Sequence, residues 1–170
     1  GVRDTKPEIT ISDATVEKLE AESKYIIIEG IGGIGKSMFL THLFLSSAQN
    51  STYSSVVPLF LSLKDYKDTT DNVVDFIWKS ICEYDSKISK KDIIEALQNK
   101  ELILLLDGFD EIQTSVRESF QSDLEAFIKS YNGNTIIMTS RPIYDSFVSF
   151  SKFSVFDIKP LTKKQALALI

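Results

Sequence analysis

The feature that most constrains the fold of this chain is a short apolar run that leads into a glycine-rich loop. Residues 24–29, KYIIIE, are rich in β-branched side chains and predict a buried strand. The loop GIGGIG follows at residues 30–35, and residues 36–48, KSMFLTHLFLSSA, carry apolar groups at helical spacing without a helix breaker. A strand, a glycine loop and a helix in direct succession predict the first unit of an α/β fold.

The remainder of the chain continues to alternate strands and helices. Four more strands are predicted, at 56–63, within 101–111, within 135–142 and at 153–158. The strand at 56–63 is expected to be buried, like the strand at 24–29. The predicted helices lie at 71–84, at 89–100, where Ser89 and Asp92 resemble a capping box, and at 115–131. Strands that are apolar on both faces are typical of parallel sheets with helices on both sides. We therefore expect a three-layer α/β/α domain with about five parallel strands.

The glycine loop has the spacing of a phosphate-binding loop, in which a glycine is followed by four residues and then by Gly35, Lys36 and Ser37. Inward-facing amides and a helix N-terminus bind anions, Lys36 adds a charge for the β- and γ-phosphates, and the Ser37 hydroxyl is a ligand for Mg²⁺. The alternative is a glycine-rich turn with a solvated lysine. The residues expected around the phosphates are Gly30, Ile31, Gly32, Gly33, Ile34, Gly35, Lys36, Ser37 and Met38.

A second polar group follows the apolar run LILLL. Asp107 ends this run and is a candidate to hold Mg²⁺ together with Ser37, unless it belongs to a solvated acidic turn that caps the next helix. Asp110 and Glu111 come one turn later. Either of them can orient a water for attack on the γ-phosphate, and one of the two can serve only to hold the loop.

A third polar group, Thr139, Ser140 and Arg141, ends the strand within 135–142. A polar side chain there can report whether a γ-phosphate is present, and Arg141 can stabilise transition-state charge. A salt bridge from Arg141 to one of the two acids of the acidic turn is an equally good interpretation. Ligands of parallel sheets bind beyond the carboxyl ends of the strands, so we expect the three groups to converge there. The candidate catalytic residues are Lys36, Asp107, Asp110, Glu111 and Arg141.

The motifs GIGGIGKS, LILLLDGFDE and IIMTSRP, in this order, resemble the NACHT nucleotide-binding domain, a branch of the STAND class of P-loop NTPases related to AAA+ proteins. Gly108 followed by paired acids is the feature that separates this family from most relatives. The resemblance covers most of residues 9–170. It implies a NACHT-type domain over residues 1–158, of which 1–8 are flexible or derived from a tag, and the start of a following helical domain at 159–170.

The resemblance also implies a function. In this family the domain is a switch that binds ATP or ADP with Mg²⁺, hydrolyses ATP slowly, and controls self-oligomerisation of a longer protein, often in innate immunity or anti-phage defence. We expect this chain to be part of such a protein, with the other domains as its partners. The segment 7–19 would lie across the adenine, with Ile9 or Ile11 as an apolar wall, although an ordinary edge segment is an equal alternative.

Composition narrows the function further. A net charge of −5 and only three arginines argue against a nucleic-acid surface, and the scarcity of arginine also argues against a small-molecule kinase, which needs several to clamp phosphate. No apolar stretch reaches the length of about 18 residues that spans a membrane, and Cys82 has no partner for a disulfide, so we expect a cytoplasmic protein. A scaffold that binds nucleotide without hydrolysing it remains open.

Other conspicuous residues predict less. The string that begins at Asn99 has Leu102 where a guanine-specific motif needs aspartate, which favours adenine nucleotides. His42 has no ligand partner at metal-binding spacing and is expected to have a surface or packing role. Phenylalanines recur at every third position near the C-terminus and predict a core stripe, part of which can face a missing domain; they are Phe147, Phe150, Phe153 and Phe156.

Overall fold

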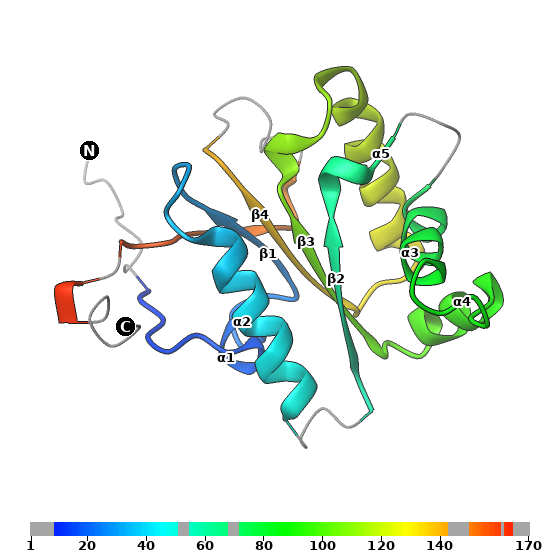
Figure 1. Cartoon of the computed structure of the whole chain (residues 1–170), viewed down its shortest axis with the longest axis horizontal. Helices are drawn as coiled ribbons and strands as arrows, with labels where there is room; N and C mark the ends of the chain where they lie inside the picture. The colour runs from blue at the N-terminus through cyan, green and yellow to red at the C-terminus, as the bar shows by residue number, and fades with distance from the viewer. Residues whose placement is uncertain (1–8, 51–54, 68–71, 143–149, 161, 165–170) are drawn as a thin grey trace, which may run out of the picture.

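The computed structural model describes residues 9–50, 55–67, 72–142, 150–160 and 162–164. These residues form a five-stranded sheet between two layers of helices (Figure 1). The strand order is β2-β3-β4-β1-β5, and all four neighbouring pairs are parallel. The strands are β1 (Tyr25–Glu29), β2 (Val57–Ser62), β3 (Leu102–Asp107), β4 (Thr135–Ser140) and β5 (Ser154–Asp157). The expected three-layer α/β/α fold is confirmed.

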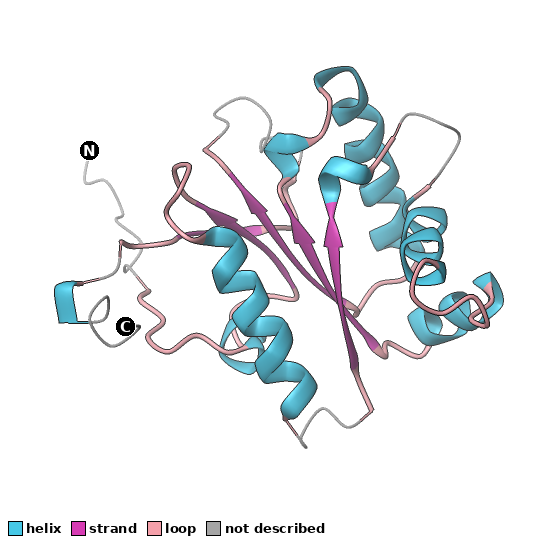
Figure 2. Ribbon diagram, viewed as in Figure 1, coloured by secondary structure: helices cyan, strands magenta, loops and turns pink. Residues whose placement is uncertain are grey.

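The helices divide between the two faces of the sheet (Figure 2). One face is covered by α1 (Val16–Glu20) and α2 (Lys36–Gln49), and the other by α3 (Val73–Cys82), α4 (Lys90–Gln98) and α5 (Thr114–Ser130). Successive strand residues point to opposite faces. In β1, Ile26 and Ile28 therefore pack with α1 and α2, whereas Ile27 packs with α3, α4 and α5.

The central strands and the edge strands differ in burial. Every residue of β4 and all but the last of β3 are buried, as expected for a parallel sheet covered on both sides. The strand predicted at 56–63 is present as β2, but the expectation that it is buried is wrong, because β2 is an edge strand that pairs, within the described chain, with β3 alone. Val57 is 52 % exposed and Phe60 is 37 % exposed.

Among the described α-helices, α1, α3 and α4 begin with a side-chain cap. The capping box predicted at α4 is confirmed, since Ser89 accepts from the amide of Asp92 and the Asp92 carboxylate accepts from the amide of Ser89. The short helix α1 was not predicted from the sequence. Its signal is Thr15, whose hydroxyl accepts from the amide of Lys18 and so caps the first turn.

An aromatic cluster supports the turn that follows β3. This turn is a 3₁₀ segment, η3 (Phe109–Glu111), and the ring of Phe109 is fully buried against Phe120 of α5 and against Phe150. Phe150 is thus part of the core, as expected, and Phe153 packs at its edge. The prediction for Phe147, and most of the prediction for residues 159–170, lie outside the described residues.

Candidate functional site

The glycine loop joins β1 to α2 at the carboxyl edge of the sheet (Figure 1). Its first amide, that of Gly30, donates to the carbonyl of Ser140 at 3.2 Å, which ties the loop to the end of β4. Gly35 has φ of 99° and occupies the N-cap of α2, a conformation that residues with a side chain rarely adopt. The loop therefore turns directly into the helix, so that the first amides of α2 lie at the site.

The Lys36 side chain folds back over the loop. Its Nζ donates to the carbonyl oxygens of Gly30 and, at 3.0 Å, of Ile31. The ammonium group is therefore held at the loop itself. The side chains of Ile31 and Met38 are 67 % and 71 % exposed.

The two residues predicted to hold a metal ion lie side by side. The Ser37 hydroxyl donates to Asp107 Oδ2 at 2.8 Å, across 70 positions of sequence. Ser37 is the second residue of α2 and Asp107 is the last of β3. The parallel sheet therefore brings together a hydroxyl and a carboxylate, both hard oxygen ligands.

The third polar group lies at the end of β4 beside the glycine loop, as predicted, but its three side chains differ in exposure. Thr139 and Ser140 are fully buried, so neither hydroxyl reaches the surface to report on a phosphate, and only Arg141 is exposed. Thr139 Oγ1 instead donates to Asp107 Oδ1 at 2.7 Å and accepts from the amide of Gly108 at 2.9 Å. Sequence reasoning singled out Thr139 but missed this contact, because the contact depends on which strand lies next to β3.

Asp110 and Arg141 form an ion pair, which was one of the two interpretations that the sequence left open. Asp110 Oδ1 accepts from the backbone amide of Arg141 at 2.9 Å, and Asp110 Oδ2 lies 3.3 Å from Arg141 Nε. The guanidinium also lies against the glycine loop, since a Cβ added to Gly32 would be 3.1 Å from Arg141 Cζ. The arginine thus connects the acidic turn to the loop.

Arg117 is a site residue that sequence reasoning did not identify. Its Nη2 donates to the carbonyl of Asp110 at 2.6 Å and its Nε donates to the carbonyl of Ile112 at 3.1 Å. The guanidinium of this α5 residue therefore holds the main chain of the acidic turn in place through two hydrogen bonds. The only sequence signal was a cation on the helix that follows the acids.

Glu111 lies over Gly108. Gly108 has φ of 83°, and a Cβ added to it would be 3.0 Å from Glu111 Cδ. The glycine thus permits both the left-handed turn and the close approach of the glutamate. Glu111 itself is exposed to solvent.

A pair of acids lies at the carboxyl ends of β1 and β5. Glu29, just before the loop, is opposite Asp157 in the register of the two strands. Burial and the negative charge of Asp157 raise the pKa of Glu29 above its usual value.

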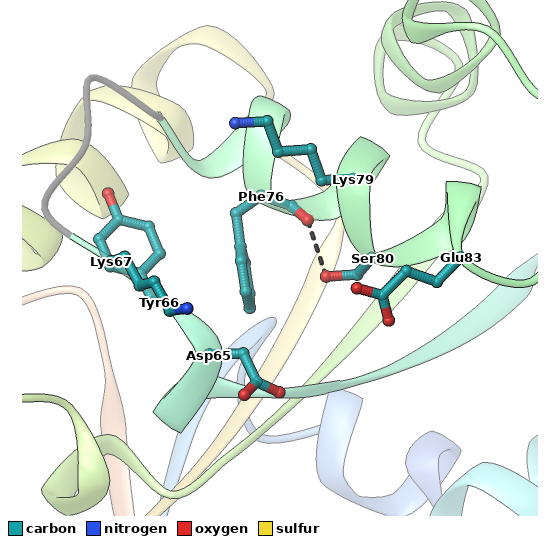
Figure 3. Close-up of a pocket in the computed structure, with 7 residues that line it drawn as sticks. All are labelled: Asp65, Tyr66, Lys67, Phe76, Lys79, Ser80 and Glu83. Atoms are coloured by element: carbon teal, nitrogen blue, oxygen red, sulfur yellow. Dashed lines mark hydrogen bonds between the residues drawn. The ribbon is translucent and has the colours of Figure 1, made fainter.

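A separate cavity of about 260 Å³ opens between η2 (Leu63–Asp65) and α3 (Figure 3). None of the predicted site residues lines it; its lining is Asp65, Tyr66, Lys67, Phe76, Lys79, Ser80 and Glu83.

His42 is exposed on α2, as expected. Ile9 is 54 % exposed, and Ile11 is half-buried against the core on the α1 and α2 face.

Comparison with known proteins gives one family. The NACHT domain model matches residues 24–170, which is most of the chain and includes all three polar groups. No curated protein matches the chain. In the described part of the chain, no helix combines the length and the apolar character needed to cross a membrane. The match and the five-stranded parallel sheet agree, and the chain belongs to the NACHT domain family of nucleotide-binding, STAND-type P-loop NTPases.

Proposed function

We propose that this domain binds ATP and ADP with Mg²⁺, hydrolyses ATP slowly, and acts as a nucleotide-dependent switch. The observation that supports this most directly is the contact between Ser37 and Asp107 beside the glycine loop. These two residues lie 70 positions apart in sequence, and the fold brings their side chains together. A hydroxyl and a carboxylate are the oxygen ligands that magnesium bound to a nucleotide requires.

The donor set at this point fits Mg²⁺. Among the described residues there is no group of three or more His, Cys, Asp or Glu side chains able to hold a metal ion, so phosphate oxygens and water would complete the shell. When bound, Mg²⁺ neutralises charge on the phosphate oxygens and so makes the γ-phosphorus easier to attack. Ser37 and Asp107 are the residues that would hold it.

The other residues have distinct roles in the proposal. The Lys36 ammonium group, which donates to loop carbonyls in this structure, would donate to phosphate oxygens when nucleotide binds. It would stay at the same place beside the loop. The Arg141 guanidinium, which lies against Gly32 of the loop, stabilises negative charge that develops on the γ-phosphate. Glu111, which is exposed above Gly108, orients the attacking water.

Family membership supports a proposal for the wider role. We propose that residues 1–158 form the nucleotide-binding domain and 159–170 begin the next domain of a longer signalling protein. Nucleotide exchange would then control self-association of that protein in immunity or anti-phage defence. Ile9 or Ile11 would contact the adenine, because Ile11 packs against the same face of the core as α2.

The first test replaces the lysine of the loop. We expect Lys36→Ala to abolish binding of Mg-ADP and Mg-ATP in calorimetry, because the variant loses the only full positive charge in the loop. The matched control is Lys129→Ala. Lys129 is exposed in the last turn of α5, away from the carboxyl ends of the strands. The Lys129→Ala variant should therefore bind nucleotide like the wild type. Equal affinity in the two variants would contradict the proposed site.

A further inference from the structure

Thr139 contacts the proposed metal-binding carboxylate although it is itself shielded from solvent. The two oxygens of Asp107 have different partners: Oδ2 accepts from Ser37 at 2.8 Å and Oδ1 accepts from Thr139 at 2.7 Å. Ser37 lies on α2, at the glycine loop, whereas Thr139 lies inside the sheet on β4. The carboxylate is therefore held between the loop and the sheet.

The direction of the bond from Thr139 is determined by its neighbour. A threonine hydroxyl has one proton to donate, and its oxygen can accept others. The amide of Gly108 donates to this oxygen at 2.9 Å, so the hydroxyl proton points to Asp107. An ionised carboxylate only accepts hydrogen bonds, which makes Thr139 a donor of fixed orientation to Asp107 Oδ1.

The sheet sets the position of this donor. Leu106 and Met138 are partners in the parallel register of β3 and β4, and Asp107 and Thr139 are the next residues along the two strands. Their side chains therefore lie on the same face of the sheet. Threonine is also stiff at χ1, and Thr139 is fully buried, so its hydroxyl has little freedom to turn away.

We propose that Thr139 is a positioning residue for metal binding. By occupying Oδ1 of Asp107, it keeps Oδ2 turned toward Ser37, where Mg²⁺ is held in the proposed function, on which this inference rests. Groups that orient a metal ligand in this way commonly change metal affinity about 10–100-fold when they are removed. Arg141 follows directly after β4, two residues beyond Thr139, so this strand sets the position of both the metal ligand and the arginine.

The test is a magnesium titration of nucleotide binding. Binding of a fluorescent ADP analogue is measured in EDTA and at increasing MgCl₂ for the wild type, Thr139→Val and Thr139→Ser. We expect Thr139→Val to bind like the wild type in EDTA but to need about tenfold more Mg²⁺ for half-maximal enhancement. Thr139→Ser keeps the hydroxyl and should restore the wild-type titration.

Thr135→Val is the matched control. Thr135 is a buried threonine at the other end of β4, and its hydroxyl donates to Glu20 instead. This control should lose stability, measured by urea unfolding, and keep the wild-type Mg²⁺ dependence. If Thr139→Val does not fold, Thr139→Ala is measured in its place, since it removes the hydroxyl without setting a methyl group against the amide of Gly108.

The outcomes separate this inference from the proposed function. A folded variant without the Thr139 hydroxyl that titrates like the wild type would overturn the positioning role alone. The same conclusion follows if Thr135→Val shifts the titration equally, or if Thr139→Ser fails to restore it. A wild-type protein that binds no nucleotide at any Mg²⁺ concentration would overturn the proposed function and this role with it.

Discussion

At the scale of single residues, hydrogen bonding distinguishes two acids that the sequence presents as equivalent. Both carboxylate oxygens of Asp110 face Arg141, one at its backbone amide and one at its guanidinium. The Glu111 carboxylate lies over Gly108, exposed to solvent. We therefore propose that Asp110 holds the turn and Glu111 orients water.

We expect Glu111→Gln to lower kcat for ATP hydrolysis about 100-fold or more, because a general base contributes at least that much. Nucleotide affinity should stay unchanged, since Glu111 belongs to the acidic turn, over Gly108, and not to the glycine loop. Steady-state ADP release and calorimetry measure the two effects.

The control is Glu118→Gln, at an exposed position of α5, which should leave both quantities unchanged. The assignment would be wrong if Asp110→Asn stopped hydrolysis while Glu111→Gln retained it.

At the scale of elements, the pairing of β1 with β5 places two acids opposite each other beside the site. β5 is a four-residue edge strand, and its pairing places Asp157 opposite Glu29. Like charges opposite each other destabilise a sheet. Burial and this neighbour raise the pKa of Glu29, so the folded chain binds this proton more tightly than the unfolded chain does.

The sign of the pH dependence follows from the raised pKa. The stability that protonated Glu29 contributes is complete below its unfolded pKa, near 4.5, and is lost as the pH rises through the folded value. We therefore expect Glu29→Gln to melt at a higher temperature than the wild type at pH 7 and at nearly the same temperature at pH 4.

Thermal melts of the two proteins across this pH range provide the measurement, and Glu118→Gln again serves as an exposed control. A difference between wild type and Glu29→Gln that grows toward low pH would contradict the prediction.

At the scale of the whole molecule, the site exists only in the folded chain. The glycine loop follows β1, Asp107 ends β3 and Arg141 follows β4. They meet because β4 lies between the other two strands. A ligand that binds this arrangement binds the native state alone, and such binding stabilises the fold by mass action.

We expect Mg-ADP at 100 times its Kd to stabilise the domain by about 2.7 kcal/mol. For a chain of this size, that free energy corresponds to a rise in Tm of about 5–10 °C. Differential scanning calorimetry measures the shift, and Lys36→Ala should show none. A wild-type Tm that stays constant as Mg-ADP is added would contradict the prediction.

The sequence by itself determined the strands, the phosphate-loop spacing and the convergence of three polar groups. Periodicity and glycine spacing are local properties of the chain, and the carboxyl ends of parallel strands always share one edge of a sheet. The meeting of Ser37 with Asp107 could be predicted for this reason.

Only the tertiary structure decided which strands are neighbours and how their side chains pair. The strand order exposes β2 at an edge and puts Thr139 beside Asp107. The packing of α5 brings the Arg117 guanidinium into hydrogen-bond contact with the acidic turn. These contacts join segments that are far apart in sequence, and no local pattern encodes the distance between them. The pairing of Asp110 with Arg141 was likewise one of two sequence-compatible arrangements, which the packing of η3 against the end of β4 resolved.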